Sequence, residues 1–242
     1  MVIPDLRGHG DSAKPGHYAL PQFVYDLHRV IHALGLQRPA ILGHSLGGHV
    51  VTRFAAQFPD QASRLIIAEG LGPPLRPQDE RYDGPNEGAR LLATMDTPRR
   101  MRPLPSIAFA AERLIANNPR LAATHALWLA QHSTDIDERG ERHWKFDPRV
   151  AELWLGADHA HNESRWQQIE VPVLVVTAEL AHEYWLGQMP IPGWSGRFTD
   201  DDLNRRLRCF RNAEHVHLED AGHMVHFDQP VELAKVTRAF LT

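Results

Sequence analysis

The chain has 242 residues, of which 43% are hydrophobic and 23% are charged. This composition is that of a globular protein and excludes a disordered, collagenous or low-complexity chain. The net charge of -4, with no basic runs, argues against nucleic acid or a membrane surface as a partner. Cys209 is the only cysteine, so no intrachain disulfide can form. Because no membrane-spanning run or signal peptide is evident, we expect a cytoplasmic protein.

Predicted helices and strands alternate along both flanks of the chain. Apolar runs predict strands at 40–42, 64–68, 171–176 and 214–218. Apolar residues at helical spacing predict helices at 18–34 and 50–58, with a last helix opening at 228. Alternation of this kind predicts an α/β fold, a mostly parallel sheet flanked by helices.

The middle of the chain has a different pattern. Residues 76–168 contain proline-rich turns and helical segments near 106–116 and 120–131, without comparable strand runs. We expect a helical insertion there, and a core made of residues 1–75 and 169–242. The several tryptophans of the insertion would either form its own core or line a pocket.

One turn carries a candidate nucleophile. Gly43–Gly47 (GHSLG) lies between the predicted strand at 40–42 and the helix that follows. A serine at the apex of such a turn has a strained backbone, and side chains two residues either side of it would clash. The turn places the hydroxyl at a helix N-terminus, where free N–H groups favour developing negative charge. Ser45 is therefore the candidate nucleophile, and a glycine-rich turn with a bystander serine is the alternative.

A serine hydroxyl needs a base to remove its proton. The chain has 16 histidines, so the position of a histidine in the chain identifies a candidate base better than its mere presence does. His223 directly follows the last predicted strand, and a loop there reaches the sheet edge at which Ser45 is expected. Gly222 would let the loop aim the imidazole ring. His223 is the candidate base, and we expect His226 to pack beside it.

Three motifs in this order resemble the α/β-hydrolase superfamily. They are Pro4–Ser12 (PDLRGHGDS), Gly43–Gly48 (GHSLGG) and Asp220–His223 (DAGH). The resemblance implies a Ser–His–acid triad, a helical cap formed by the insertion, and an oxyanion-hole N–H from Leu46. An aspartate at the nucleophile position marks dehalogenases and epoxide hydrolases of this superfamily, whereas Ser45 points to acyl transfer.

The triad acid departs from the family pattern. Ala181 stands where an aspartate is expected, after the strand at 171–176. A carboxylate is needed to hold the imidazole in the correct tautomer. Glu69, which ends the strand at 64–68, resembles the acid of some haloalkane dehalogenases and serine-hydrolase-like proteins. An isolated acid at the end of an apolar strand is costly without a partner, so we favour Glu69, with Glu179 and Glu183 as alternatives.

The family members normally begin with strands that precede the Pro4–Ser12 motif, and one of their loops donates a second oxyanion N–H. This chain begins at the fourth strand of that pattern, so we expect an N-terminally truncated fragment. Missing strands would leave a sheet edge unpaired, which favours a homo-oligomer. The loss of one oxyanion donor would cost on the order of 10²–10³ in rate.

These observations predict a serine hydrolase that cleaves an ester or related small acyl substrate. Ser45 would attack, His223 would act as base and acid, and Glu69 would orient His223, with no cofactor or metal. The expected partner is a hydrophobic small-molecule acyl substrate. The alternatives are an inactive hydrolase-fold binding protein, and a metal-dependent hydrolase built on the pairs His159/His161 and His215/His217.

Overall fold

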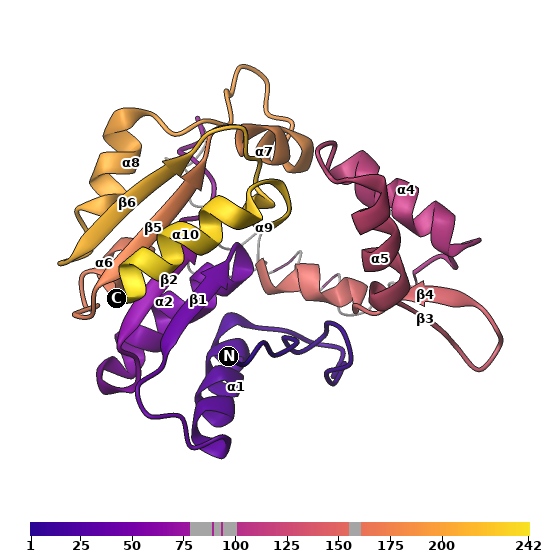
Figure 1. Cartoon of the computed structure of the whole chain (residues 1–242), viewed down its shortest axis with the longest axis horizontal. Helices are drawn as coiled ribbons and strands as arrows, with labels where there is room; N and C mark the ends of the chain where they lie inside the picture. The colour runs from indigo at the N-terminus through magenta and orange to yellow at the C-terminus, as the bar shows by residue number, and fades with distance from the viewer. Residues whose placement is uncertain (78–88, 90–92, 94–100, 155–160) are drawn as a thin grey trace. The chain divides into compact units, whose positions relative to one another are not determined.

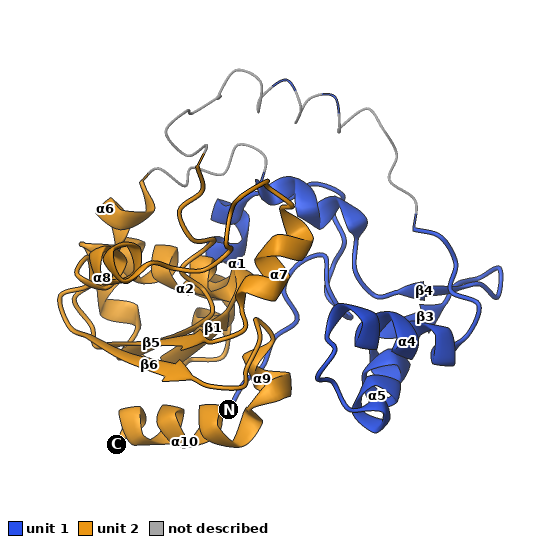
Figure 2. Cartoon of the chain, turned by 90° about the horizontal axis from the view of Figure 1, so that it is seen from above, with its two compact units in different colours: residues 1–26, 83–157 blue, residues 27–82, 158–242 orange. Residues whose placement is uncertain are grey.

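The computed structural model describes residues 1–77, 89, 93, 101–154 and 161–242. The chain forms two compact units, which are coloured separately in Figure 2. Unit 1 contains residues 1–26 and 83–157, and unit 2 contains residues 27–82 and 158–242. The N-terminal residues are thus grouped with the middle of the chain rather than with the sheet. The predicted division at residues 75 and 169 stays a prediction.

Unit 2 is built on a four-stranded parallel sheet in the order β1-β2-β5-β6 (Figure 1). The strands are β1 (Ala40–His44), β2 (Arg64–Ala68), β5 (Val173–Ala178) and β6 (Ala213–Leu218). The register pairs His44 with Ala68, and Ala68 with Val176. The carboxyl ends of β1, β2 and β5 therefore meet at one edge. This arrangement confirms the predicted fold class.

The central strands are apolar along their whole length because both of their faces are covered. All six residues of β5 are buried, and Leu65 to Ala68 of β2 are buried too. Helix α10 (Pro230–Leu241) packs Leu233 and Phe240 against Ile66 and Leu174 in one apolar cluster. Continuous apolar runs of this kind are typical of a parallel sheet between helices.

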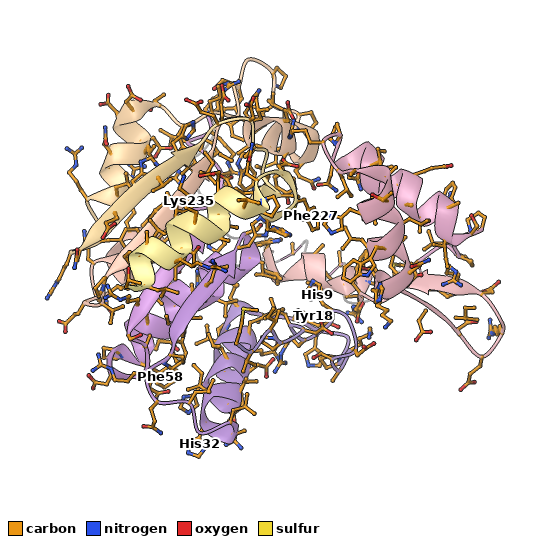
Figure 3. The ribbon with its side chains drawn as sticks, viewed as in Figure 1. His9, Tyr18, His32, Phe58, Phe227 and Lys235 are labelled. Carbon is orange, nitrogen blue, oxygen red and sulfur yellow. The ribbon has the colours of Figure 1, made fainter. Side chains whose placement is uncertain are left out.

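Helices precede or follow the strands along the chain. Helix α1 (Leu20–Ala33), which spans the boundary between the two units, ends just before Gly35, whose φ of +60° is in the left-handed region. Helix α2 (Leu46–Gln57) packs on β1 and β2 and is followed by the short 3₁₀ helix η1 (Pro59–Gln61). The shorter helices are α6 (Asn162–Trp166), α7 (His182–Gln188), α8 (Asp200–Leu207) and α9 (Val225–Asp228). Phe227 of α9 is labelled in Figure 3.

Unit 1 combines the N-terminal segment with helices and a small hairpin. Its elements are α4 (Ile107–Asn117), α5 (Ala123–Ser133), β3 (Thr134–Ile136), β4 (Arg142–Trp144) and η2 (Pro148–Trp154). The Tyr18 hydroxyl donates to Asp147 Oδ2 at 2.6 Å, which ties the N-terminal segment to the middle of the chain. Three-residue strands are too short to show a period in the sequence, and so the β3–β4 hairpin was not predicted.

The aromatic residues of the middle segment have mixed surroundings. Trp166 is buried and stacks on Phe210, with ring centroids 5.3 Å apart. Trp128, by contrast, is 53% exposed. The segment therefore does not gather its described tryptophans into a single core.

Strand β1 lies at one end of the described sheet, and its Leu42 side chain is 46% exposed. No helix among the described residues is both long enough and apolar enough to cross a membrane.

Candidate active site

Ser45 occupies a strained turn between β1 and α2. Its φ of 49° and ψ of -113° are unusual for a residue with a side chain. A Cβ added at Gly43 would lie 2.3 Å from the Gly47 carbonyl oxygen, so only glycine fits there. A Cβ at Gly47 would meet nothing within 4 Å, which corrects the prediction that both glycines are needed. The second steric requirement is at Gly48, whose Cβ would lie 2.6 Å from the Gly70 Cα.

His223 reaches Ser45 from the loop after β6. Its Nε2 is 2.9 Å from Ser45 Oγ, and the histidine is 4% exposed. The loop turns at Asp220, which has a φ of 54°, and not at Gly222 as expected from the sequence. The Gly222 N–H instead donates to Asp228 Oδ2 at 2.7 Å, so α9 holds the loop in place.

Glu69 completes the arrangement from the end of β2. Its Oε2 is 3.2 Å from His223 Nδ1, and its Oε1 accepts the Ala178 N–H at 2.7 Å. The backbone of Glu69 is also left-handed, with a φ of 49°. Ser45, His223 and Glu69 thus come from the ends of three segments far apart in the sequence. The alternative Glu179 instead accepts the Asp220 N–H at 3.1 Å, and Glu183 is exposed on α7.

Burial controls the protonation of the His223–Glu69 pair. Loss of hydration raises the pKa of Glu69 to about 8, although the Ala178 N–H and the charge of His217 oppose this. Burial lowers the pKa of His223 to about 4. The two groups are in contact, so they titrate as a pair. His223 Nε2 is free to accept the Ser45 proton when Glu69 is a carboxylate and His223 is neutral. Near neutral pH the pair holds one proton more than this state.

A second histidine holds the main chain of His223. His44 Nε2 is 2.7 Å from the His223 carbonyl oxygen and must donate to it, because a carbonyl oxygen only accepts. Burial, followed by the proximity of His223, lowers the pKa of His44 to about 4, so this imidazole is neutral with its proton on Nε2. His226 packs edge-on against His44, with ring centroids 4.6 Å apart. His226 therefore packs against His44, which in turn contacts His223.

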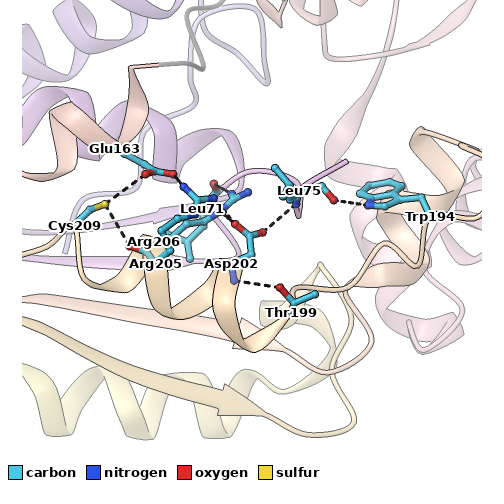
Figure 4. A network of polar contacts seen from close by, with 9 residues as sticks. All are labelled: Leu71, Leu75, Glu163, Trp194, Thr199, Asp202, Arg205, Arg206 and Cys209. Carbon is cyan, nitrogen blue, oxygen red and sulfur yellow. Dashed lines mark hydrogen bonds and ion pairs between the residues drawn. The ribbon is translucent and has the colours of Figure 1, made fainter. Parts of the chain in front are cut away.

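Helix α8 anchors the segment that follows Glu69 (Figure 4). Buried Asp202 accepts the Leu75 N–H at 3.0 Å and pairs with Arg206 Nε at 2.9 Å. Arg206 Nη1 donates to the Leu71 carbonyl at 2.9 Å. Arg206 lies on a short, highly charged helix, yet its side chain is only 11% exposed. The network fixes the loop between β2 and residue 75 at two backbone positions.

The histidine pairs do not form a metal site among the described residues. His215 Nε2 and His217 Nδ1 both contact the Thr177 hydroxyl, at 2.8 and 3.0 Å, and His159 lies outside the described residues. One described group, in the β3–β4 hairpin of unit 1, could hold a metal ion: Asp137, Glu141 and His143. Its two carboxylates are exposed, as acidic groups without a metal commonly are.

A parallel sheet with a strained serine turn, and a histidine and an acid at the same edge, defines a class of α/β enzymes. The sequence profile of the alpha/beta hydrolase family matches residues 1–236. The chain belongs to this family, as its three motifs indicated.

Individual relatives agree with this assignment. The esterase Rv0045c of Mycobacterium tuberculosis is 26% identical, in an alignment covering 98% of this chain and 72% of the esterase. The (lyso)-N-acylphosphatidylethanolamine lipase of Bos taurus is 35% identical over 80 residues, which cover 31% of this chain and 23% of the lipase. The chain matches only 21% to 27% of the length of the first curated relatives.

The fold has a close counterpart in a solved structure. The thioesterase domain from the curacin biosynthetic pathway superposes with a TM-score of 0.79 at 24% identity. The superposition covers 98% of this chain and 80% of that domain.

Proposed function

We propose that this protein is a serine hydrolase that cleaves an ester or a related small acyl substrate. Ser45 Oγ attacks the acyl carbon while His223 Nε2 takes the serine proton. His223 then gives this proton to the leaving alcohol as its bond to the acyl carbon breaks. Water, activated by the same histidine, releases the acyl group as an acid and restores Ser45. No cofactor takes part.

The observation that carries the proposal is the continuous line from Ser45 Oγ through the imidazole of His223 to Glu69. The two contacts measure 2.9 Å and 3.2 Å, within or close to hydrogen-bond reach for a nucleophile, its base and an orienting acid. Helix α2 begins at Leu46, so the Leu46 N–H is available to the developing oxyanion.

The substrate class rests on the surroundings of His223. The ring of Trp185 meets its imidazole edge-on, with ring centroids 5.3 Å apart. An aromatic surface beside the base favours a hydrophobic group on the acyl or alcohol side. Relatives that are named an esterase and a lipase support the same class.

The proposal is tested by steady-state hydrolysis of p-nitrophenyl esters of increasing acyl length. We expect turnover by the native chain, none above background for Ser45→Ala, and no effect of EDTA. Circular dichroism of Ser45→Ala checks that the fold is kept. Turnover that survives Ser45→Ala would contradict the serine mechanism, and turnover lost to EDTA would favour a metal-dependent hydrolase. A folded native chain without turnover would favour the binding-protein alternative.

A further inference from the structure

Tyr184 lies flat against the candidate catalytic histidine. Its ring centroid is 3.9 Å from that of His223, and the two planes differ by 12°. Trp185 meets the same imidazole edge-on at 5.3 Å and packs against Tyr184 at 5.0 Å. Both residues come from the first turns of α7, which directly follows β5 at the sheet edge that holds Glu69.

The position of Tyr184 is not explained by core packing. None of the seven residues of α7 is buried, and Tyr184 is itself only partly covered. This partial loss of hydration raises the pKa of the Tyr184 phenol, so the ring beside the imidazole is neutral. Of the candidate catalytic groups, the one that the described Tyr184 ring contacts is His223, on which it stacks.

His223 needs support against one particular motion. Its ring must keep Nδ1 toward Glu69 and Nε2 toward Ser45 while it gains and loses a proton. His44 fixes the main chain of His223 but leaves rotation about the Cβ–Cγ bond open. A ring stacked in parallel on the imidazole blocks that rotation, and its negative face favours the imidazolium.

We propose that Tyr184 is a positioning residue that keeps the His223 imidazole in line with Ser45 and Glu69 and stabilises its charged form. This inference rests on the proposed function, because it assigns His223 the role of base. Among the residues that the structure describes, the titratable groups around the imidazole are Glu69, which follows β2, His44 from β1, Tyr184 from α7 and, behind His44, His226 from α9. The Tyr184 ring lies nearly parallel to the His223 imidazole, whereas the His44 ring is tilted by 50° to it.

The test compares Tyr184→Phe, which keeps the aromatic face, with Tyr184→Leu and Tyr184→Met, which remove it. Tyr25→Leu, at an exposed site of α1, is the matched control. Acetyl and octanoyl p-nitrophenyl esters give kcat and KM, and proton NMR follows the downfield imidazole N–H signal of His223. His223→Gln identifies that signal.

We expect Tyr184→Phe and Tyr25→Leu to stay within about twofold of the native kcat. Tyr184→Leu and Tyr184→Met should lose about tenfold in kcat, by the same factor for both esters and with KM little changed. The downfield signal should broaden in these two variants and persist in Tyr184→Phe. A second aliphatic variant keeps the comparison available if one of them fails to fold.

Three results would overturn the inference. These are an unchanged kcat in both aliphatic variants, a loss confined to KM or to one ester, and an NMR signal that is unchanged without the aromatic face. The NMR comparison needs no turnover, so it decides the role of Tyr184 even if the native chain hydrolyses neither ester. In that case the proposed function fails separately.

Discussion

Glu69 and Ala178 are joined across neighbouring strands by a hydrogen bond of 2.7 Å from the Ala178 N–H to Glu69 Oε1. This bond leaves Oε2 as the oxygen that faces His223, at 3.2 Å from Nδ1. Ala178 belongs to β5, the strand after which the family acid commonly lies. The carboxylate that faces His223 follows the adjacent strand β2, and β5 contributes a backbone donor that orients it.

Glu69→Gln should lower kcat by about 10⁴. The Ala178 N–H requires an oxygen, so the new amide will turn its NH₂ group toward Nδ1 of His223. The imidazole must then accept at Nδ1 and carry its proton on Nε2, where it cannot act as a base for Ser45. Steady-state kinetics on p-nitrophenyl esters measures the loss.

Glu179→Gln and Glu183→Gln serve as matched controls for this substitution. Glu179 binds the Asp220 N–H, and its amide oxygen would keep that bond. Both variants should retain the native kcat within about twofold. A large loss in either control, with little change in Glu69→Gln, would transfer the role of the acid to α7 or the turn before it.

The activity should rise with pH through about 8, the value to which burial raises the pKa of Glu69. Below this pH the pair holds an extra proton, either on Glu69 or as an imidazolium, and in both forms Nε2 of His223 is protonated. Above it the pair is a carboxylate beside a neutral imidazole with Nε2 free. The pH profile of kcat/KM measures this, and a plateau that is already reached at pH 6 would contradict it.

Gly48→Ala should destabilise the fold by about 1–3 kcal/mol, because the added Cβ would lie 2.6 Å from the Gly70 Cα. Gly47→Ala is the matched control, since its Cβ would meet nothing within 4 Å. Urea unfolding should show the control to be within about 1 kcal/mol of the native chain. Equal effects at the two positions would mean that the approach of α2 to Gly70 is not a tight contact.

Asp202→Ala should destabilise the fold by about 3–5 kcal/mol, because it leaves the largely covered Arg206 without its carboxylate and the Leu75 N–H without its acceptor. Asp201→Ala, at the exposed neighbouring position of α8, should change the free energy of unfolding by less than about 0.5 kcal/mol. Urea unfolding of both variants gives the comparison. Similar stabilities would show that the network does not hold the segment after Glu69.

The sequence predicted the parallel sheet because β2 and β5 are continuous apolar runs, and it predicted the serine turn because the glycine and serine of Gly43–Gly47 follow the strand expected at 40–42. Long-range relations were harder to predict. The low exposure of the Arg206 side chain depends on Asp202 and on the carbonyl of Leu71, which lies 135 positions away in the sequence. A charged residue on a short polar helix carries no local signal of such a partner.

The stacking of Tyr184 could not be predicted for a similar reason. Tyr184 and His223 come from segments that follow different strands, and their rings meet only because those strands are adjacent in the sheet. The left-handed turn at Asp220 likewise lies two residues before Gly222, which was the more obvious candidate. The local pattern favoured Gly222, whereas the hydrogen bond of Gly222 to Asp228 decides the geometry.

The central claim is that Ser45 is a nucleophile activated by His223. Labelling with a fluorophosphonate, followed by peptide mass spectrometry, tests it most directly, because the reagent forms a stable bond only with an activated serine. We expect one phosphonate per chain, located at Ser45, absent in Ser45→Ala and strongly slowed in Glu69→Gln. A folded native chain that is not labelled, or is labelled at another residue, would contradict the claim.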